Sequence, residues 1–249
     1  MRFKLMQQGS ALRTNIGSLG ASSVTFIESE GKKFLVDTGH YGRRKGLLNY
    51  LFLSNIKVDD IDAVILTHLH WDHALNYDLF TSAEFFVGEE ELEYNEKIPV
   101  TDLYTVRHFN KLTEGYHIIA VKSEEFRINN EITLFKMPGH TPGHIIVVAK
   151  DKQQKIIITG DALPNARAFS RGVPDIITFN ERAAKDSAEK IKKMSEDSLV
   201  IPGHDTPFRI QGSSLVYEES TETEFIFRED RERDFVIKIS ETASKNSYH

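Results

Sequence analysis

Short apolar runs separated by turn residues recur along the chain. They are rich in Val, Ile and Phe, and their length and composition favour buried β-strands over helices. Glu30-Gly31 separates the first two runs and predicts a hairpin turn. The runs are Val24–Ile27, Lys33–Asp37, Ala63–Leu66, Glu84–Val87, Ile132–Phe135, Ile145–Val148, Ile156–Thr159 and, as the last of the series, Leu199–Ile201.

Apolar residues at helical spacing lie between these strands. One predicted helix follows the basic segment Arg43-Arg44-Lys45 and carries Leu47, Leu48, Leu51 and Phe52. The clearest helix covers Glu181–Ser195, with Asn180 as its N-cap. Its apolar face consists of Ala184, Ala188, Ile191 and Met194. Strands and helices therefore mix along the whole chain, which predicts an α/β protein.

No low-complexity linker divides the chain, so we expect one domain over residues 1–215. Residues 216–249 form a charged C-terminal extension. Phe225–Phe227 and Phe235–Ile239 are strand-like within it, Glu229–Asp234 would form the turn, and a frayed tail begins at Thr242. These two strands would cover the core or form the edge of a dimer, and we favour a homodimer.

The composition limits the possible chemistry. The chain has 249 residues, ten histidines and no cysteine. Disulfides, thiolate metal ligands and a cysteine nucleophile are therefore excluded. Any transition metal would be bound by imidazole and carboxylate groups.

Charge and hydropathy limit the possible partners and location. The formal net charge is −6, which disfavours nucleic acid as the main partner, because phosphate backbones require a basic surface. The N-terminus lacks the apolar core of a signal peptide, and no apolar run is long enough to span a membrane. We therefore expect a cytoplasmic protein with no membrane partner.

The segment Thr67-His68-Leu69-His70-Trp71-Asp72-His73 carries the strongest chemical signal. It directly follows the predicted strand Ala63–Leu66. Three histidines and an aspartate lie within six residues, where a rigid strand end presents them to a loop. This density of ligand side chains is rarely structural and predicts a metal site.

Three further strands end in turns that carry histidine or aspartate. His140 and His144 lie in Pro138-Gly139-His140-Thr141-Pro142-Gly143-His144, after the strand Ile132–Phe135. Asp161 follows the strand Ile156–Thr159, and His204 follows Leu199–Ile201. Four strand ends that present ligand side chains would build a metal site at one edge of a sheet.

With these motifs in this order, the chain resembles the metallo-β-lactamase superfamily. The match rests on HLHWDH at 68–73, His140, Asp161 and His204, with LVDTG at 35–39 as a further element. The resemblance implies a four-layer αββα sandwich, an α/β fold with two mixed β-sheets packed face to face. It also implies a two-metal site at one edge of the sandwich.

The resemblance also implies which residues bind which ion. His68, His70 and His140 would hold the first metal, Asp72, His73 and His204 the second, and Asp161 would bridge both. We expect two divalent ions, with zinc first and iron, manganese or cobalt equally suited to these ligand types. A hydroxide shared by the two metals would be the nucleophile, and Asp72 would pass a proton to the leaving atom.

The remaining candidates have weaker signals. Asp37 either forms a simple Asp-Thr-Gly turn or accepts a hydrogen bond that orients a ligand imidazole. For His144 we favour a structural role near the strand start over a contact with a ligand. His40 would face the cleft or lie on a surface loop, and Trp71 would pack or form a cleft wall. No ligand position of the family matches His108, His117 or His249.

Subfamilies differ at residues that can be checked. The absence of cysteine disfavours the zinc β-lactamases that carry a cysteine where Asp161 stands. The chain is similar to acyl-homoserine lactonases and glyoxalase II-like proteins in size or motifs. The lactonases carry a tyrosine three residues after the bridging aspartate, and Pro164 occupies that position here. Tyr41, Tyr77 or Tyr104 would have to substitute for it.

Three functions follow from this reading. The first is metal-dependent hydrolysis of a small ester, lactone or thioester, with a small molecule as the substrate. The second is a phosphodiesterase or endoribonuclease, because Pro202-Gly203-His204-Asp205-Thr206-Pro207-Phe208 resembles a run in small nuclease-like members. The third is a non-catalytic metal-binding protein, which the presence of all seven candidate ligands disfavours.

Overall fold

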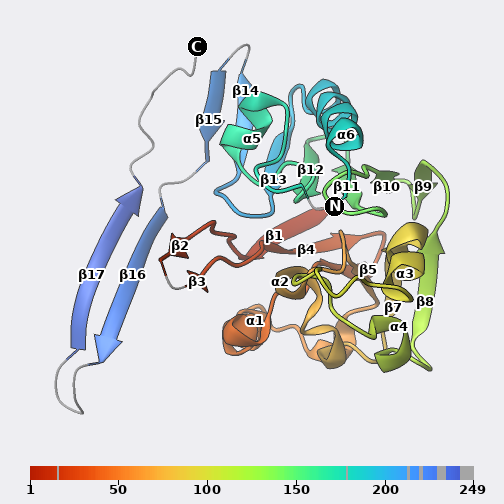
Figure 1. Cartoon of the computed structure of the whole chain (residues 1–249), viewed down its shortest axis with the longest axis horizontal. Coiled ribbons are helices and arrows are strands. Elements are labelled where there is room, and N and C mark those ends of the chain that lie inside the picture. The colour runs from red at the N-terminus through yellow and green to blue at the C-terminus, as the bar shows by residue number, and fades with distance from the viewer. Residues whose placement is uncertain (16, 178, 212–213, 219–220, 229–233, 242–249) are drawn as a thin grey trace.

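The apolar runs form two mixed β-sheets that pack face to face, with helices outside both (Figure 1). The computed structural model describes residues 1–15, 17–177, 179–211, 214–218, 221–228 and 234–241. The first sheet has the order β1-β4-β5-β6-β7-β8 and the second β15-β14-β13-β12-β11-β10-β9. The expected αββα sandwich is confirmed.

The first sheet is parallel from β5 to β8 and antiparallel at its other edge. Glu30 and Gly31 both have positive φ values, 48° and 78°, so the predicted hairpin turn between β4 and β5 is confirmed. The strands are β1 (Arg2–Gln7), β4 (Val24–Ser29), β5 (Lys32–Val36), β6 (Ala63–Ile65), β7 (Glu84–Gly88) and β8 (His117–Val121).

In the second sheet, only β12 and β13 run parallel to each other as neighbours. Two strands follow Leu199–Ile201, so that run is not the last strand of the sheet. The strands are β9 (Glu125–Arg127), β10 (Ile132–Lys136), β11 (Ile145–Lys150), β12 (Lys155–Gly160), β13 (Leu199–Pro202), β14 (Phe208–Gln211) and β15 (Ser214–Tyr217).

Helices cover the outer faces of both sheets. The clearest predicted helix is confirmed as α6 (Glu181–Met194), and the Asn180 side chain accepts a hydrogen bond from the Ala183 amide as its N-cap. The other helices are η1 (Tyr41–Arg43), α1 (Arg44–Leu53), η2 (Val58–Asp60), α2 (Trp71–Ala74), η3 (Tyr77–Leu79), α3 (Glu89–Asn95), α4 (Phe109–Leu112) and α5 (Ala166–Arg171). No helix in the described residues is long and apolar enough to cross a membrane.

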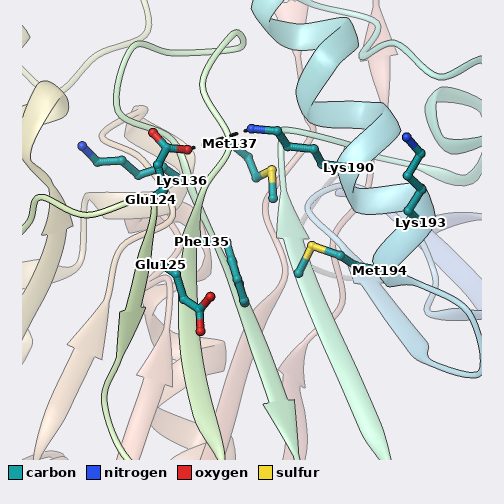
Figure 2. Close-up of a pocket in the computed structure, with 8 residues that line it drawn as sticks. All are labelled: Glu124, Glu125, Phe135, Lys136, Met137, Lys190, Lys193 and Met194. Atoms are coloured by element: carbon teal, nitrogen blue, oxygen red, sulfur yellow. Dashed lines mark ion pairs between the residues drawn. The ribbon is translucent and has the colours of Figure 1, made fainter.

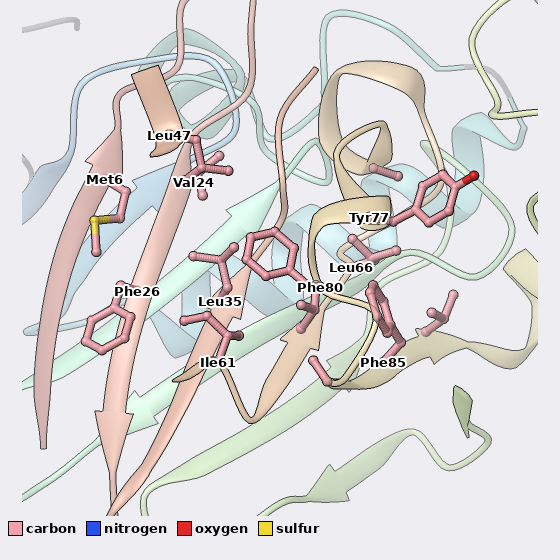
Figure 3. Packing of buried hydrophobic residues seen from close by; sticks show 14 of the residues in the cluster. Met6, Val24, Phe26, Leu35, Leu47, Ile61, Leu66, Tyr77, Phe80 and Phe85 are labelled. Carbon is pink, nitrogen blue, oxygen red and sulfur yellow. The ribbon is translucent and has the colours of Figure 1, made fainter. Parts of the chain in front are cut away.

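The core has three apolar layers, which explains why the strands are apolar on both faces. Ile145 and Val147 of β11 point between the sheets, whereas Ile146 points outward under α5 and α6. Leu35 of β5 and Phe85 of β7 belong to the layer under the helices of the first sheet (Figure 3). Because side chains alternate along a strand, one continuous apolar run serves two layers.

Two small strand pairs lie outside the sandwich sheets. The pair β2 (Arg13–Thr14) and β3 (Gly17–Ser18) lies in the N-terminal segment. The two C-terminal strands predicted from sequence are confirmed as β16 (Thr221–Arg228) and β17 (Asp234–Glu241), which pair only with each other among the described residues (Figure 1). The expected turn lies mostly, and the expected tail entirely, outside the described residues. The expected boundary at 215/216 falls within β15 and stays a prediction.

Candidate metal centre

Four strand ends bring the candidate ligands to one edge of the sandwich. The motif at 67–73 follows β6, His140 follows β10, Asp161 follows β12 and His204 follows β13. The edge is tied across the two sheets, because the Ile145 amide at the start of β11 donates to the Thr67 carbonyl at 2.8 Å. The carboxyl ends of β12 and β13 meet because these strands run parallel.

The seven side chains form two groups. His68, His70, His140 and Asp161 make one group, and Asp72, His73 and His204 make the other. Within each group, one ligand atom of every residue lies within 4.8 Å of the others. These are the two sets expected from the family resemblance, with Asp161 placed among the first.

Asp161 lies between the two groups. Its Oδ2 is 3.5 Å from His140 Nε2 and 3.2 Å from His204 Nε2, and its Oδ1 is 3.3 Å from His73 Nε2. A single carboxylate therefore faces imidazoles from both groups. This is the position that a ligand shared by two ions requires.

Several atoms of the cluster are buried without a hydrogen-bond partner. They are His68 Nε2, His70 Nε2, His73 Nε2 and Asp161 Oδ1. A buried polar atom without a partner costs about 1–3 kcal/mol, so this grouping of atoms favours a bound cation. Imidazole nitrogens and carboxylate oxygens suit zinc and its first-row neighbours. The residues present therefore fit a divalent metal centre.

Asp37 orients the His73 ring. His73 Nδ1 donates to Asp37 Oδ2 at 2.7 Å, which leaves Nε2 of His73 facing the cluster. The backbone amide and hydroxyl of Thr67 also donate to this carboxylate, at 2.8 and 2.9 Å. Asp37 has a φ of 58° and is 2% exposed, so its turn conformation and its contact with the histidine coexist.

Three of the other candidate imidazoles are anchored through their Nδ1 atoms, whereas Nδ1 of His70 lies 3.0 Å from His140 Nε2 within the cluster. His140 Nδ1 donates to the Ile176 carbonyl at 2.8 Å, and His204 Nδ1 donates to the Ala21 carbonyl at 3.1 Å. His68 Nδ1 donates to the Thr67 hydroxyl at 3.1 Å. These contacts hold the tautomers that direct Nε2 toward the cluster.

His144 supports Asp161 from behind. Its Nε2 accepts from the amides of Asp161 and Ala162 at 3.1 and 3.2 Å. Burial and the nearby His140 lower the pKa of His144 well below its usual value, so the ring is neutral and accepts hydrogen bonds. A Cβ at Gly160 would lie 2.9 Å from this nitrogen, so the glycine permits the contact. The contact is structural, with the backbone of a candidate ligand.

The electrostatics of the two groups differ. Burial, with the neighbouring imidazoles, holds the pKa values of His68 and His70 well below the usual value. Burial opposes protonation of His73 too, but Asp161 and Asp37 outweigh it and raise the pKa of His73 well above normal. The carboxylates of Asp161 and Asp37 therefore favour positive charge beside His73, which a bound cation would supply.

The sequence matches a known family model over most of its length. Residues 17–204 match the model of the metallo-β-lactamase superfamily. The chain belongs to this superfamily.

Relatives and solved structures agree with this assignment. A probable metallo-hydrolase of Methanocaldococcus jannaschii is 30% identical over 81% of this chain and 86% of its own length. An N-acyl homoserine lactonase of a Bacillus species is 26% identical over 64% of this chain and 62% of its own length. This metallo-β-lactamase superfamily member is thus a metal-dependent hydrolase, and its His/Asp cluster fits a binuclear centre.

Two solved structures share the fold. A putative metallo-β-lactamase from Thermotoga maritima superposes with a TM-score of 0.67 at 21% identity, covering 84% of this chain and 98% of its own. A dizinc quorum-quenching lactonase in complex with a product superposes with a TM-score of 0.64 at 16% identity, covering 81% and 80%. At these identities the likeness shows the fold alone.

Tyr104 is the one of the three candidate tyrosines that contacts a metal-centre imidazole of this superfamily member. Its ring centroid lies 5.6 Å from that of His70, and the side chain is 44% exposed. Tyr77 is buried in the core against Phe109, and Tyr41 lies on the surface beside Arg44. Sequence position offers no signal for this contact, because residues 104–106 reach His70 only through tertiary pairing.

Neither ligand group includes His40, His108 or His117. His40 Nδ1 accepts from the Gly42 amide, and its ring contacts Trp71 at a centroid distance of 5.1 Å. His117 pairs with Glu84 on the surface, and His108 precedes α4 with a φ of 62°. His249 lies outside the described residues.

A separate cavity of about 340 Å³ opens between β9, β10 and α6 (Figure 2). Phe135, Met137 and Met194 line its apolar part, and Lys190 pairs with Glu124 across its rim at 3.9 Å. None of the seven candidate ligands lines this cavity. This cavity is therefore distinct from the His/Asp cluster.

Proposed function

We propose that this protein hydrolyses a small carboxylic ester, lactone or thioester at a binuclear metal centre. The observation that carries the proposal is the position of Asp161 between two groups of imidazole and carboxylate ligands. A shared ligand of this kind places two ions close enough to act on one substrate.

His68, His70 and His140 would hold one ion, Asp72, His73 and His204 the other, and Asp161 both. Two ions bound there would supply a hydroxide nucleophile at neutral pH and neutralise the oxyanion that its attack on a carbonyl creates. Zinc is the first expectation, supported by the dizinc lactonase of the same fold. Iron, manganese and cobalt suit the same ligands.

Asp72 would pass a proton to the leaving atom. Its Oδ2 lies 3.3 Å from His204 Nε2, and its side chain is 13% exposed, compared with 0% for His73. Asp72 therefore lies on the more open side of the cluster, where a leaving group would depart. Ion binding would reduce the basicity of this carboxylate, which suits it to release the proton again.

The lactonase relatives support a carbonyl substrate. The resemblance to lactonases implies a tyrosine where this chain has Pro164, and Tyr104 contacts His70 of the cluster here. We propose that Tyr104 forms one wall of the substrate site. The exposed half of its ring would pack against the part of the substrate that does not react.

The test is a substrate panel combined with metal analysis. Metal-loaded protein should contain close to two ions per chain and should hydrolyse at least one lactone or thioester. Bis(p-nitrophenyl) phosphate and single-stranded RNA belong in the panel, because cleavage of these alone would replace the proposal with the phosphodiesterase hypothesis. His68→Ala should abolish the activity. A protein that binds two ions and hydrolyses nothing in a broad panel would favour the non-catalytic alternative.

A further inference from the structure

Glu91 is a buried carboxylate that the proposed reaction does not use. It lies in the first turn of α3 and is 1% exposed. Its neighbour Glu90 turns outward and pairs with Lys136. Taking a carboxylate out of water is costly unless its oxygens find strong partners, so the partners of Glu91 show what the site requires.

Both oxygens of Glu91 bind backbone amides of the metal-centre loops. Oε2 accepts from the Leu69 amide at 3.1 Å, and Oε1 accepts from the Gly143 amide at 2.9 Å. Leu69 lies between His68 and His70 in sequence, and Gly143 lies in the turn that carries His140. One side chain therefore ties together the two loops that supply all three imidazoles of the first group.

The backbones are packed closely enough to fix this arrangement. A Cβ at Gly143 would lie 2.3 Å from the Glu91 amide nitrogen, and a Cβ at Gly88 would lie 2.0 Å from the Gly143 carbonyl oxygen. Glycine at both positions lets the start of α3 contact the His140 loop directly. The carboxylate then has little freedom to seek other partners.

The chemistry of the contact requires two acceptors. Each amide presents an N–H, and an ionised carboxylate accepts at both oxygens. A glutamine would turn its NH₂ group toward one of these backbone N–H groups. Two donors would then face each other with no acceptor between them. The contact therefore selects glutamate over its neutral isostere, and charge-assisted bonds of this type are the stronger ones.

We propose that Glu91 is a positioning residue that sets the spacing of His68, His70 and His140 for the first metal ion. This inference rests on the proposed binuclear centre. Asp37 does the corresponding work for the second group, because it contacts His73 and the Thr67 amide that precedes His68. Glu91 thus positions ligands of the first group, and Asp37 positions a ligand of the second.

The experiment compares Glu91→Gln with Glu93→Gln, the same change at an exposed position of the same helix. Metal-free proteins are titrated with Co²⁺ and Zn²⁺ against a competing chelator, and the two binding steps are measured by absorption and metal analysis. For E91Q we expect one of the two steps to weaken by about 10–100-fold, the usual effect of losing a contact behind the ligands. E93Q should match the unmodified protein in both steps.

Two measurements separate positioning from simple stabilisation. Circular dichroism and thermal unfolding of the metal-free proteins report whether E91Q folds, and Glu91→Asp, which keeps the carboxylate on a shorter side chain, should give a smaller loss of affinity. If E91Q is less stable but its folded form binds both ions with unchanged affinity, the proposal is wrong. If the unmodified protein itself binds fewer than two ions, the proposed function fails first, and the two failures are thus distinguishable.

Discussion

The Oδ2 atom of Asp37 lies 2.7 Å from Nδ1 of His73, and both side chains are buried. The residues are 36 positions apart in the chain. Their contact fixes the His73 ring with its other nitrogen toward Asp161, so the turn after β5 determines the geometry of a ligand that follows β6.

Asp37→Asn should weaken binding of the second ion more than binding of the first. The amide retains one acceptor, but its NH₂ group meets the amide and hydroxyl of Thr67 or the His73 ring. We expect a 10–100-fold loss in one binding step, which is about 1.4–2.7 kcal/mol. Metal titration checks this, with the exposed Asp59→Asn as a control. Equal weakening of both steps would contradict the division between Asp37 and Glu91.

Asp161→Ala should disturb both ions at once. The carboxylate faces His73, His140 and His204, so its loss removes a shared ligand and the charge that offsets two cations. Metal content after dialysis should fall below one ion per chain, and hydrolysis should fall by more than about 100-fold, a larger loss than that for contacts behind the ligands. Retention of two tightly bound ions would show that Asp161 is not the shared ligand.

Substitution of Tyr104 should change substrate use and leave metal binding intact. Tyr104→Ala removes the ring beside His70, and we expect KM to rise by about 10-fold, equivalent to 1.4 kcal/mol of binding. Tyr104→Phe keeps the ring, so a fall in kcat for this variant would assign a role to the hydroxyl. Steady-state kinetics across an acyl-chain series, with metal analysis of each variant, makes the test. Unchanged kinetics in both variants would remove Tyr104 from the substrate site.

Gly88→Ala should destabilise the fold. Its new Cβ would lie 2.0 Å from the Gly143 carbonyl oxygen, which is backbone and cannot move aside as a side chain does. Overpacking of this kind costs about 1–3 kcal/mol, measurable as a lower urea midpoint. Gly46→Ala in α1 is the control, because its nearest neighbour is the flexible end of Gln7 at 3.1 Å. A Gly88→Ala protein as stable as the unmodified one would contradict the close packing of α3 on the His140 loop.

The candidate ligands were predictable because the signal is local. His68, His70, Asp72 and His73 directly follow a buried strand. This pattern predicts both metal binding and its position at a sheet edge. The αββα sandwich followed from resemblance. The edge strands β1, β9 and β15 and the neighbouring β14 were not predicted, because their mixed polar and apolar residues do not form an apolar run. The edge strand β8 was not predicted either. The expected homodimer stays a prediction, which light scattering would test.

The supporting residues required the tertiary structure. Glu91 stands in the acidic run Glu89-Glu90-Glu91 at a helix start, where sequence favours a solvated carboxylate interacting with the helix dipole. Asp37 was equally compatible with a turn and with a contact to an imidazole. Nothing local distinguishes Tyr104 from Tyr41 or Tyr77.

The sequence alone determined which atoms are available to bind metal and which strand ends carry them, because side-chain chemistry and strand periodicity are properties of short segments. Only the tertiary structure decided that Asp161 lies between two groups and that Asp37 and Glu91 hold the loops behind them. Those contacts join residues 22 to 88 positions apart, since hydrogen bonds and buried charges depend on distances in space that the order of residues does not record.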